Sequence, residues 1–150
     1  IGNWNTSSVT TMEAMFTDAR AFNQNIGSWD VSSVTTFYRL FQGAQNFNNG
    51  DAAGVTSNTM NWDVSNVTNM FGMFNNADSF NQNLNSWDVS SVIDMYAMFA
   101  QASSFNADLT DWDVSSVTNM GWMFHKASIF CNNSVTSSSC CFIFIMNKLN

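Results

Sequence analysis

One phrase returns along this chain at a nearly constant interval, and no other feature restricts the fold as strongly. The phrase is Trp-Asp-Val-Ser-x-Val, with copies that begin at Trp29, Trp62, Trp87 and Trp112 and a weaker copy at Trp4. Neighbouring tryptophans are 25 residues apart, except that 33 residues separate Trp29 from Trp62. A fixed period of this length is typical of a solenoid, in which each repeat forms one coil that stacks on the next.

The apolar residues of each repeat predict the elements of one coil. Trp and Val alternate across an Asp, as in Trp62 and Val64, which is the period of a short strand. Apolar residues then follow mainly in steps of three, as in Val67, Met70 and Met73, which is typical of a short helix or of successive tight turns. We therefore predict an α/β solenoid, a leucine-rich-repeat-like right-handed superhelix. It has about five 25-residue coils, each with one short strand and one short helix or turn.

The repeats divide the chain into a solenoid of residues 1–136 and a C-terminal segment of residues 137–150. The coils are expected to start near Trp4, Trp29, Trp62, Trp87 and Trp112. The longer second repeat carries its additional residues in 49–61, a polar and Gly-containing stretch that predicts a loop insertion. We expect residues 137–150 to be a capping or disordered tail. Because the chain begins on a repeat boundary, we also expect it to be part of a longer chain or assembly.

Charge and cysteine content restrict the partners. The net charge is −7, so a nucleic-acid partner, which requires a basic stripe, is not expected. No apolar run is long enough for a membrane-spanning helix. The three cysteines, Cys131, Cys140 and Cys141, do not have the spacing of a metal site. They predict either one disulfide that closes the last coil or free buried thiols.

The repeat also resembles a known family. Residues 80–102 follow the pattern F-N-x-x-L-x-x-W-D-V-S-x-V-T-N-M-x-x-M-F-x-x-A, with departures at Ile93 and Asp94. This pattern is similar to the BspA-type leucine-rich repeats, a surface-protein repeat of unknown function in mycoplasma lipoproteins. The resemblance extends over residues 1 to about 131. It implies an extracellular or cell-surface location and a role in adhesion or host contact, and it implies no catalytic residue.

Stacked repeats place equivalent residues in columns, and one column is acidic. It consists of Asp30, Asp63, Asp88 and Asp113. Carboxylates stacked in one column repel one another, so one interpretation is a cation ladder that binds calcium. The alternative is that each Asp accepts hydrogen bonds from the amide and hydroxyl of the serine two residues later. Apart from this calcium alternative, no cofactor or metal is expected.

Positions that vary between repeats are candidates for ligand contact, because the scaffold does not determine them. Nine and ten residues after the tryptophan lie Tyr38, Arg39, Phe71, Tyr96 and Trp122, which predict an exposed aromatic row. Such a row is suited to binding protein or glycan. The alternative is packing against a neighbouring loop or a like subunit.

Other residue patterns suggest weaker hypotheses. A threonine column of Thr10, Thr35, Thr68 and Thr118 raises ice binding as a minor alternative, although Ile93 interrupts it. Glycosylation sequences occur at Asn5, Asn66 and Asn132. His125 and Lys126 are expected at the end of a helix, where a cation is favourable.

These observations predict a function without catalysis. The chain has no Ser-His-Asp or Cys-His set and no Gly-rich phosphate loop. We expect a non-enzymatic surface or secreted module for protein or glycan recognition and adhesion. The structural alternative is a subunit that stacks end to end with like subunits in a filament, shell or larger assembly.

Overall fold

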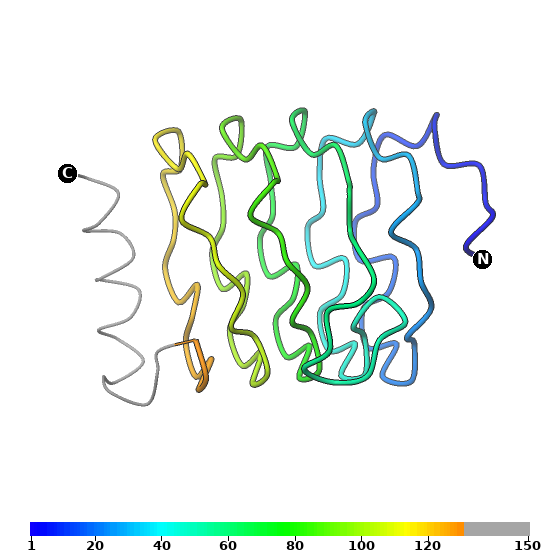
Figure 1. Cartoon of the computed structure of the whole chain (residues 1–150). Helices are drawn as coiled ribbons and strands as arrows, with labels where there is room; N and C mark the ends of the chain where they lie inside the picture. The colour runs from blue at the N-terminus through cyan, green and yellow to red at the C-terminus, as the bar shows by residue number, and fades with distance from the viewer. Residues whose placement is uncertain (131–150) are drawn as a thin grey trace.

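The structure is a computed structural model of the 150-residue chain, and it describes residues 1–130. The repeats lie side by side as successive coils, in chain order from one end of the molecule to the other (Figure 1). Isolated parallel bridges join equivalent residues of neighbouring coils. They link Thr11 to Thr36, Thr36 to Asn69, Asn69 to Asp94, and Asp94 to Asn119. The 25-residue period therefore corresponds to one coil, as the sequence predicts.

The coils are built from turns, and the predicted α/β class is wrong. Residues 1–130 contain no helix and no extended strand, only turns, bends and isolated bridges. In the second coil the stretch expected to be helical closes with i to i+3 bonds, from Leu40 N to Phe37 O at 3.0 Å and from Ala44 N to Phe41 O at 3.0 Å. These bonds define successive tight turns rather than an α-helix.

Left-handed backbone conformations explain why a helix cannot form. The residues ten and fourteen positions after each tryptophan have positive φ, for example Arg39 at 55° and Gly43 at 70°. Each of them is the third residue of a turn, the position that requires φ > 0 in a type II turn. The set is Ala14, Asp18, Arg39, Gly43, Gly72, Asn76, Ala97, Gln101, Trp122 and Lys126. Two such residues in every coil interrupt any right-handed helix.

The predicted strand is absent because the chain turns immediately after the Trp-Asp-Val segment. Val34 N donates to Val31 O at 2.8 Å, which closes a turn over the two serines. The Asp30 carboxylate fixes the same turn by accepting the Ser32 amide at 3.1 Å and the Ser32 hydroxyl at 2.7 Å. An Asp side chain that bonds the backbone two residues ahead forms an Asx-turn, which competes with an extended conformation.

Alternate backbone N–H groups hold neighbouring coils together. In the second coil, Phe37, Arg39, Phe41 and Gly43 donate to carbonyls of the third coil at 2.8–2.9 Å. The N–H groups between them, such as those of Leu40 and Gln42, donate within their own coil. The backbone is thus satisfied without a regular strand or helix, as a buried segment requires.

Aromatic columns form the core. In the third coil Phe74 and Phe80 stack with ring centroids 3.8 Å apart, and Phe74 stacks on Phe99 of the next coil at 5.6 Å. The indole N–H groups donate to carbonyls of the preceding coil, for example Trp62 to Ile26 O at 3.1 Å. The predicted Trp, Val and Phe columns are therefore buried in the middle of the stack. In the first coil, by contrast, Trp4 is 55% exposed.

The predicted loop insertion, residues 49–61, forms a lobe at the lower edge of the stack (Figure 1). Its anchor is Asp51, which is buried and accepts bonds from the Asn58 amide at 2.7 Å and the Ser57 hydroxyl. The carboxamide of Asn48 donates to the carbonyls of Ala52 and Val55 at 2.7 and 2.8 Å. The loop is accordingly ordered by its own polar side chains and by Asn48 directly before it. No helix in the described residues is long and apolar enough to cross a membrane.

Candidate functional site

The predicted aromatic residues form a continuous row along one edge of the stack. Tyr38 and Phe71 have ring centroids 5.1 Å apart, Phe71 and Tyr96 are also 5.1 Å apart, and Tyr96 and Trp122 are 6.4 Å apart. All three pairs are stacked, with interplanar angles of 29°, 18° and 18°. Because stacked rings cover one another's faces, Tyr38, Phe71 and Tyr96 are half-buried, and of the four rings only Trp122 is exposed.

The residues two positions earlier in the chain fix the backbone of the row. The carboxamide oxygen of Asn69 accepts the Phe71 amide at 2.9 Å, and the carboxylate of Asp94 accepts the Tyr96 amide at 2.8 Å. Carbonyls of the row accept amides of the preceding coil, such as Tyr96 O from Gly72 N at 2.8 Å. Both sets of bonds hold the rings in register from coil to coil.

A groove of about 370 Å³ runs along this row. Its lining consists of aromatic, small, carboxamide and basic residues. They are Arg39, Gln42, Phe71, Gly72, Asn75, Tyr96, Ala97, Ala100, Gln101, Trp122, His125 and Lys126. None of these twelve residues is Asp or Glu, although the whole chain has a net charge of −7. The groove therefore differs in charge from the rest of the molecule.

Four lining residues larger than alanine have positive φ, between 55° and 60°: Arg39, Gln101, Trp122 and Lys126. Trp122 has φ of 60° and Arg39 has φ of 55°, while the equivalent positions of other coils carry Gly72, Ala97 and Ala14. A bulky residue at positive φ is unfavourable by roughly 1–3 kcal/mol and is frequent at functional sites. Trp122 is also 61% exposed, so burial of its indole does not offset this cost. These features favour a role for Trp122 in contact with a ligand.

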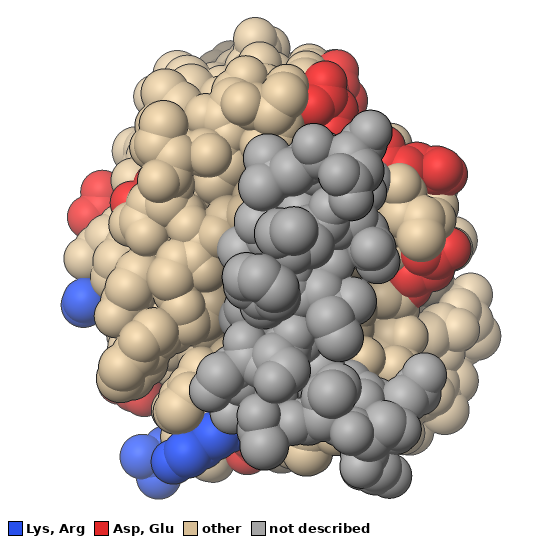
Figure 2. Space-filling view, turned by 90° about the vertical axis from the view of Figure 1, so that its left-hand side faces the viewer, with Lys and Arg blue, Asp and Glu red and all other residues tan. Residues whose placement is uncertain are grey.

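The basic residues lie at the two ends of the groove. The Arg39 guanidinium carbon lies 4.9 Å from the Tyr38 ring centroid and 5.5 Å from that of Phe71, within range of a cation–π interaction. At the other end, the His125 ring packs on Trp122 at 4.7 Å, next to Lys126. Seen along the stack, the Lys and Arg side chains in view lie at the left and lower left, whereas the largest acidic patches lie at the upper right (Figure 2).

In the acidic column each carboxylate accepts hydrogen bonds from the serine two residues later, which is the predicted alternative to calcium binding. Asp63 and Asp88 each accept the amide and the hydroxyl of the serine two residues later, at 2.6–3.1 Å, as Asp30 does. Asp113 accepts the amide of its serine at 2.9 Å. Within residues 1–130 there is no cluster of three or more His, Cys, Asp or Glu side chains able to hold a metal ion.

The pKa shifts in this column follow from the same hydrogen bonds. The Ser90 hydroxyl, followed by the Ser90 amide, lowers the pKa of Asp88, while partial burial and the neighbouring Asp113 carboxylate raise it by less. The Ser32 hydroxyl likewise lowers the pKa of Asp30. Repulsion from the neighbouring carboxylate therefore changes the pKa of Asp88 less than the hydrogen bonds to Ser90 do.

The remaining predicted positions do not gather into a site. The hydroxyls of Thr35, Thr68 and Thr118 are exposed but donate to carbonyls of the preceding coil at 3.3–3.4 Å. Asn5 and Asn66 are exposed, and Asn66 donates to Ser32 O at 2.9 Å. The predictions for Asn132, for Cys131, Cys140 and Cys141, and for the 137–150 tail lie outside the described residues.

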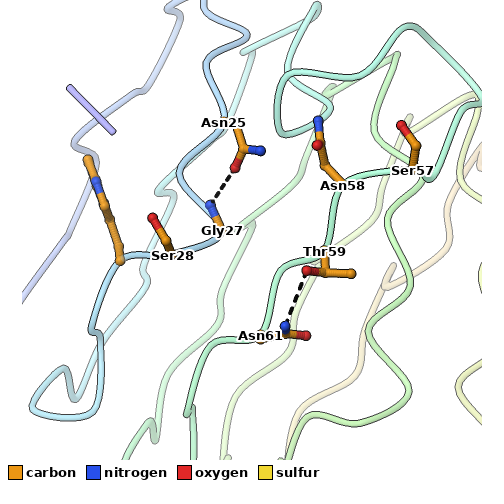
Figure 3. A pocket seen from close by; sticks show the side chains of 8 residues that line it. Asn25, Gly27, Ser28, Ser57, Asn58, Thr59 and Asn61 are labelled. Atoms are coloured by element: carbon orange, nitrogen blue, oxygen red, sulfur yellow. Dashed lines mark hydrogen bonds between the residues drawn. The ribbon is translucent and has the colours of Figure 1, made fainter. Parts of the chain in front are cut away.

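A second pocket, of about 410 Å³, lies between the second coil and the inserted loop (Figure 3). Its walls are polar and uncharged and include Asn25, Ser57, Asn58 and Asn61. These side chains already bond within the fold: Asn25 accepts the Gly27 amide at 3.1 Å, and Asn58 donates to Asn49 O at 2.9 Å. The pocket is thus less suited to ligand recognition than the groove on the aromatic row.

The polar and basic half of the groove was not predicted from the repeat pattern. Gln42, Asn75 and Gln101 lie along it, and Lys126 lies at its end. Lys126 was expected at the end of a helix, but it occupies a turn with φ of 58°. These residues lie thirteen or fourteen positions after the tryptophan, and the positive φ of the intervening turns brings them next to the row. The residue type at these two positions varies between repeats, and this variation is the sequence feature from which they could have been predicted as groove residues.

The comparisons with known proteins identify a family. The model of the family described as "Mycoplasma protein of unknown function, DUF285" matches residues 1–58 and 49–141. Neither the curated proteins nor the solved structures contain a match to the chain. Because the two matched segments together span most of the sequence, the chain belongs to the family described as Mycoplasma protein of unknown function, DUF285.

Proposed function

We propose that this chain is a non-enzymatic recognition module of a cell-surface or secreted protein, and that it binds a protein or glycan ligand through the groove on the aromatic row. The observation that carries the proposal is the exposed Trp122, held at φ of 60° at the end of a stacked row. The indole of Trp122 is 61% exposed and so contributes little to folding, and a contribution to binding explains its presence better.

The surface location and the adhesive role rest on the sequence. The 25-residue repeat is similar to the BspA-type leucine-rich repeats, which implies a surface or secreted protein. The stacked coils also supply a suitable scaffold, because the row extends over four coils and presents several contacts in register. Extended surfaces of this kind are what repeat proteins use to bind ligands.

A comparison of two tryptophan variants tests the proposal. The purified chain is applied to an array of glycans and to an array of extracellular-matrix proteins. Trp122→Ala is expected to abolish the binding signals. Trp4→Ala is the matched control, because Trp4 is also exposed, at 55%, but lies in the first coil away from the groove. Equal signals for both variants, or no reproducible signal on either array, would contradict the proposal.

The structural alternative is assembly with like subunits. It is supported by the exposed apolar side chains of the first coil, where Ile1 is 41%, Trp4 is 55% and Met15 is 43% exposed. This alternative predicts self-association that rises with concentration and is weakened by Trp4→Ala. Sedimentation velocity of the wild-type chain and of the two tryptophan variants distinguishes the two functions.

A further inference from the structure

We infer that the groove on the aromatic row binds an acidic polysaccharide, a hydroxyl-rich chain that carries carboxylate or sulfate groups. The inference rests on the proposed recognition function and names the class of ligand. Three observations on the same groove carry it: its charge, the orientation of its rings, and its carboxamides.

Charge is the first observation. The lining contains Arg39 and Lys126 and no carboxylate, in a chain with eleven acidic residues and only four Lys and Arg. Arg20 is the other Lys or Arg in residues 1–130, and it lies outside the groove. Since the overall charge of −7 repels anions, the absence of acidic residues along one groove favours an anionic ligand there.

The orientation of the rings is the second observation. Phe71 and Tyr96 stack face to face along the row at 5.1 Å, so they offer their edges to the groove. Ring edges carry partial positive charge, whereas the faces are negative. Such edges attract hydroxyl and carboxylate oxygens, and they are poor platforms for an apolar ligand. Trp122, at 61% exposure, is the most exposed ring of the row.

The carboxamides are the third observation. Gln42, Asn75 and Gln101 come from three successive coils, so amide groups recur along the length of the groove. Each carboxamide both donates and accepts hydrogen bonds, which suits the hydroxyl groups of successive sugar units. Between them the floor is formed by small residues, with Gly72, Ala97 and Ala100 all buried. The arrangement accommodates an extended chain that lies parallel to the stack.

An acidic peptide would carry the same charge but fits less well. A peptide added in extended form needs free backbone groups at the edge it joins. Here the amides of Arg39, Gly72 and Ala97 already donate to the next coil at 2.8 Å. Recognition must therefore come from side chains, and these are suited to hydroxyl groups.

The test uses the whole chain and two pairs of matched probes. Polygalacturonate is compared with its fully methyl-esterified form, and dextran sulfate with dextran, by isothermal titration calorimetry. The members of each pair share a sugar backbone and differ in whether it carries anionic groups, and the two pairs separate carboxylate from sulfate recognition. Poly-L-glutamate represents the acidic peptide.

We expect binding of at least one acidic polysaccharide, with weaker binding of its neutral partner and of poly-L-glutamate. Arg39→Gln and Lys126→Gln are each expected to weaken that binding by about tenfold or more, the loss of one charge-assisted hydrogen bond. Arg20→Gln is the matched control and should leave it unchanged. Circular dichroism confirms that the variants are folded.

Three results would overturn the inference, and they separate it from the proposed function. Binding of the neutral probes at equal strength, lost in Trp122→Ala but kept in Lys126→Gln, would disprove the acidic ligand and retain the recognition function. Equal or tighter binding of poly-L-glutamate would assign the groove to acidic peptides. No binding of either acidic polysaccharide would reject the ligand class, while the array signals of Trp122→Ala would decide the function independently.

Discussion

At the scale of single residues, the fold depends on a few residues whose close contacts cannot be predicted from the repeat pattern. Gly27 is one of these residues, because an added Cβ would lie 1.9 Å from Thr59 O and 2.9 Å from the Asn49 carboxamide nitrogen. Gly27 therefore allows the second coil to approach the inserted loop. Asp51 is another, because its buried carboxylate orders that loop.

We predict that Gly27→Ala destabilises the protein by at least about 1–3 kcal/mol, because the contact is with backbone and cannot be relieved by moving one side chain. Gly2→Ala is the matched control at the equivalent position of the first coil, where the nearest atom, Asn25 O, is 3.0 Å from the added Cβ. Urea unfolding of both variants measures the difference. Equal stability of the two would show that the loop is not packed this closely.

The stability contributed by Asp51 should depend on pH. The Asn58 amide, and next the Ser57 hydroxyl, hold the pKa of Asp51 below its usual range, and this outweighs the opposing effect of burial. A carboxylate with a lowered pKa in the folded state stabilises the fold above its unfolded pKa of about 3.9. That contribution is lost as the pH falls through the folded pKa.

Asp51→Asn should therefore be less stable than wild type at pH 7, and the difference should shrink towards pH 3. Urea unfolding across this range is the measurement. Asp78→Asn is the control, because the Asp78 carboxylate accepts no hydrogen bond in the described structure. A difference between wild type and Asp51→Asn that stays constant with pH would show that the effect is not due to ionisation.

At the scale of elements, the turn replaces the helix as the unit of each coil. Apolar residues spaced three positions apart are compatible with a helix and with successive turns, and the backbone conformation decides which of the two forms. Positive φ recurs ten and fourteen positions after the tryptophan of each repeat. Only two of these ten positions are glycine, Gly43 and Gly72. Asp18 and Asn76 are residue types that tolerate a left-handed conformation, but the other six sites carry residues that do not favour it, so packing between coils must impose it there.

A reciprocal exchange at the same repeat position tests this assignment. Gly72→Ala should destabilise the protein by about 1 kcal/mol, because φ is 58° and the nearest atom to an added Cβ is 3.7 Å away, which leaves conformation as the main cost. Ala14→Gly, at an exposed site with φ of 53°, should stabilise it by a similar amount. In a helix both changes in stability would have the opposite sign, because Ala is favoured over Gly there by about 1 kcal/mol.

At the scale of the whole molecule, stability comes from columns that run through all coils. Each coil contacts mainly its neighbours, so a residue in a central coil has partners on both sides and a residue in a terminal coil on one. Phe74 is fully buried and stacks on both Phe41 and Phe99 at 5.6 Å, whereas Phe16 is only partly buried. The groove on the aromatic row depends on the same stacking, since its rings come from successive coils.

We predict that Phe74→Ala costs about 3–5 kcal/mol and that Phe16→Ala costs clearly less. Thermal unfolding of both variants, monitored by near-ultraviolet circular dichroism, provides the comparison. A similar loss for both would indicate that the columns do not support one another along the stack.

The repeat pattern alone was enough to predict the period, the inserted loop, the buried columns and the aromatic row, because equivalent residues of stacked repeats lie in columns. That the coils are made of turns could be learned only from the folded chain, because hydrophobic spacing reports which side chains are buried and contains no information about the sign of φ. The tertiary structure also decided which polar side chains border the aromatic row. Gln42, Asn75, Gln101 and Lys126 come together through turns whose left-handed residues are selected by hydrogen bonds between coils.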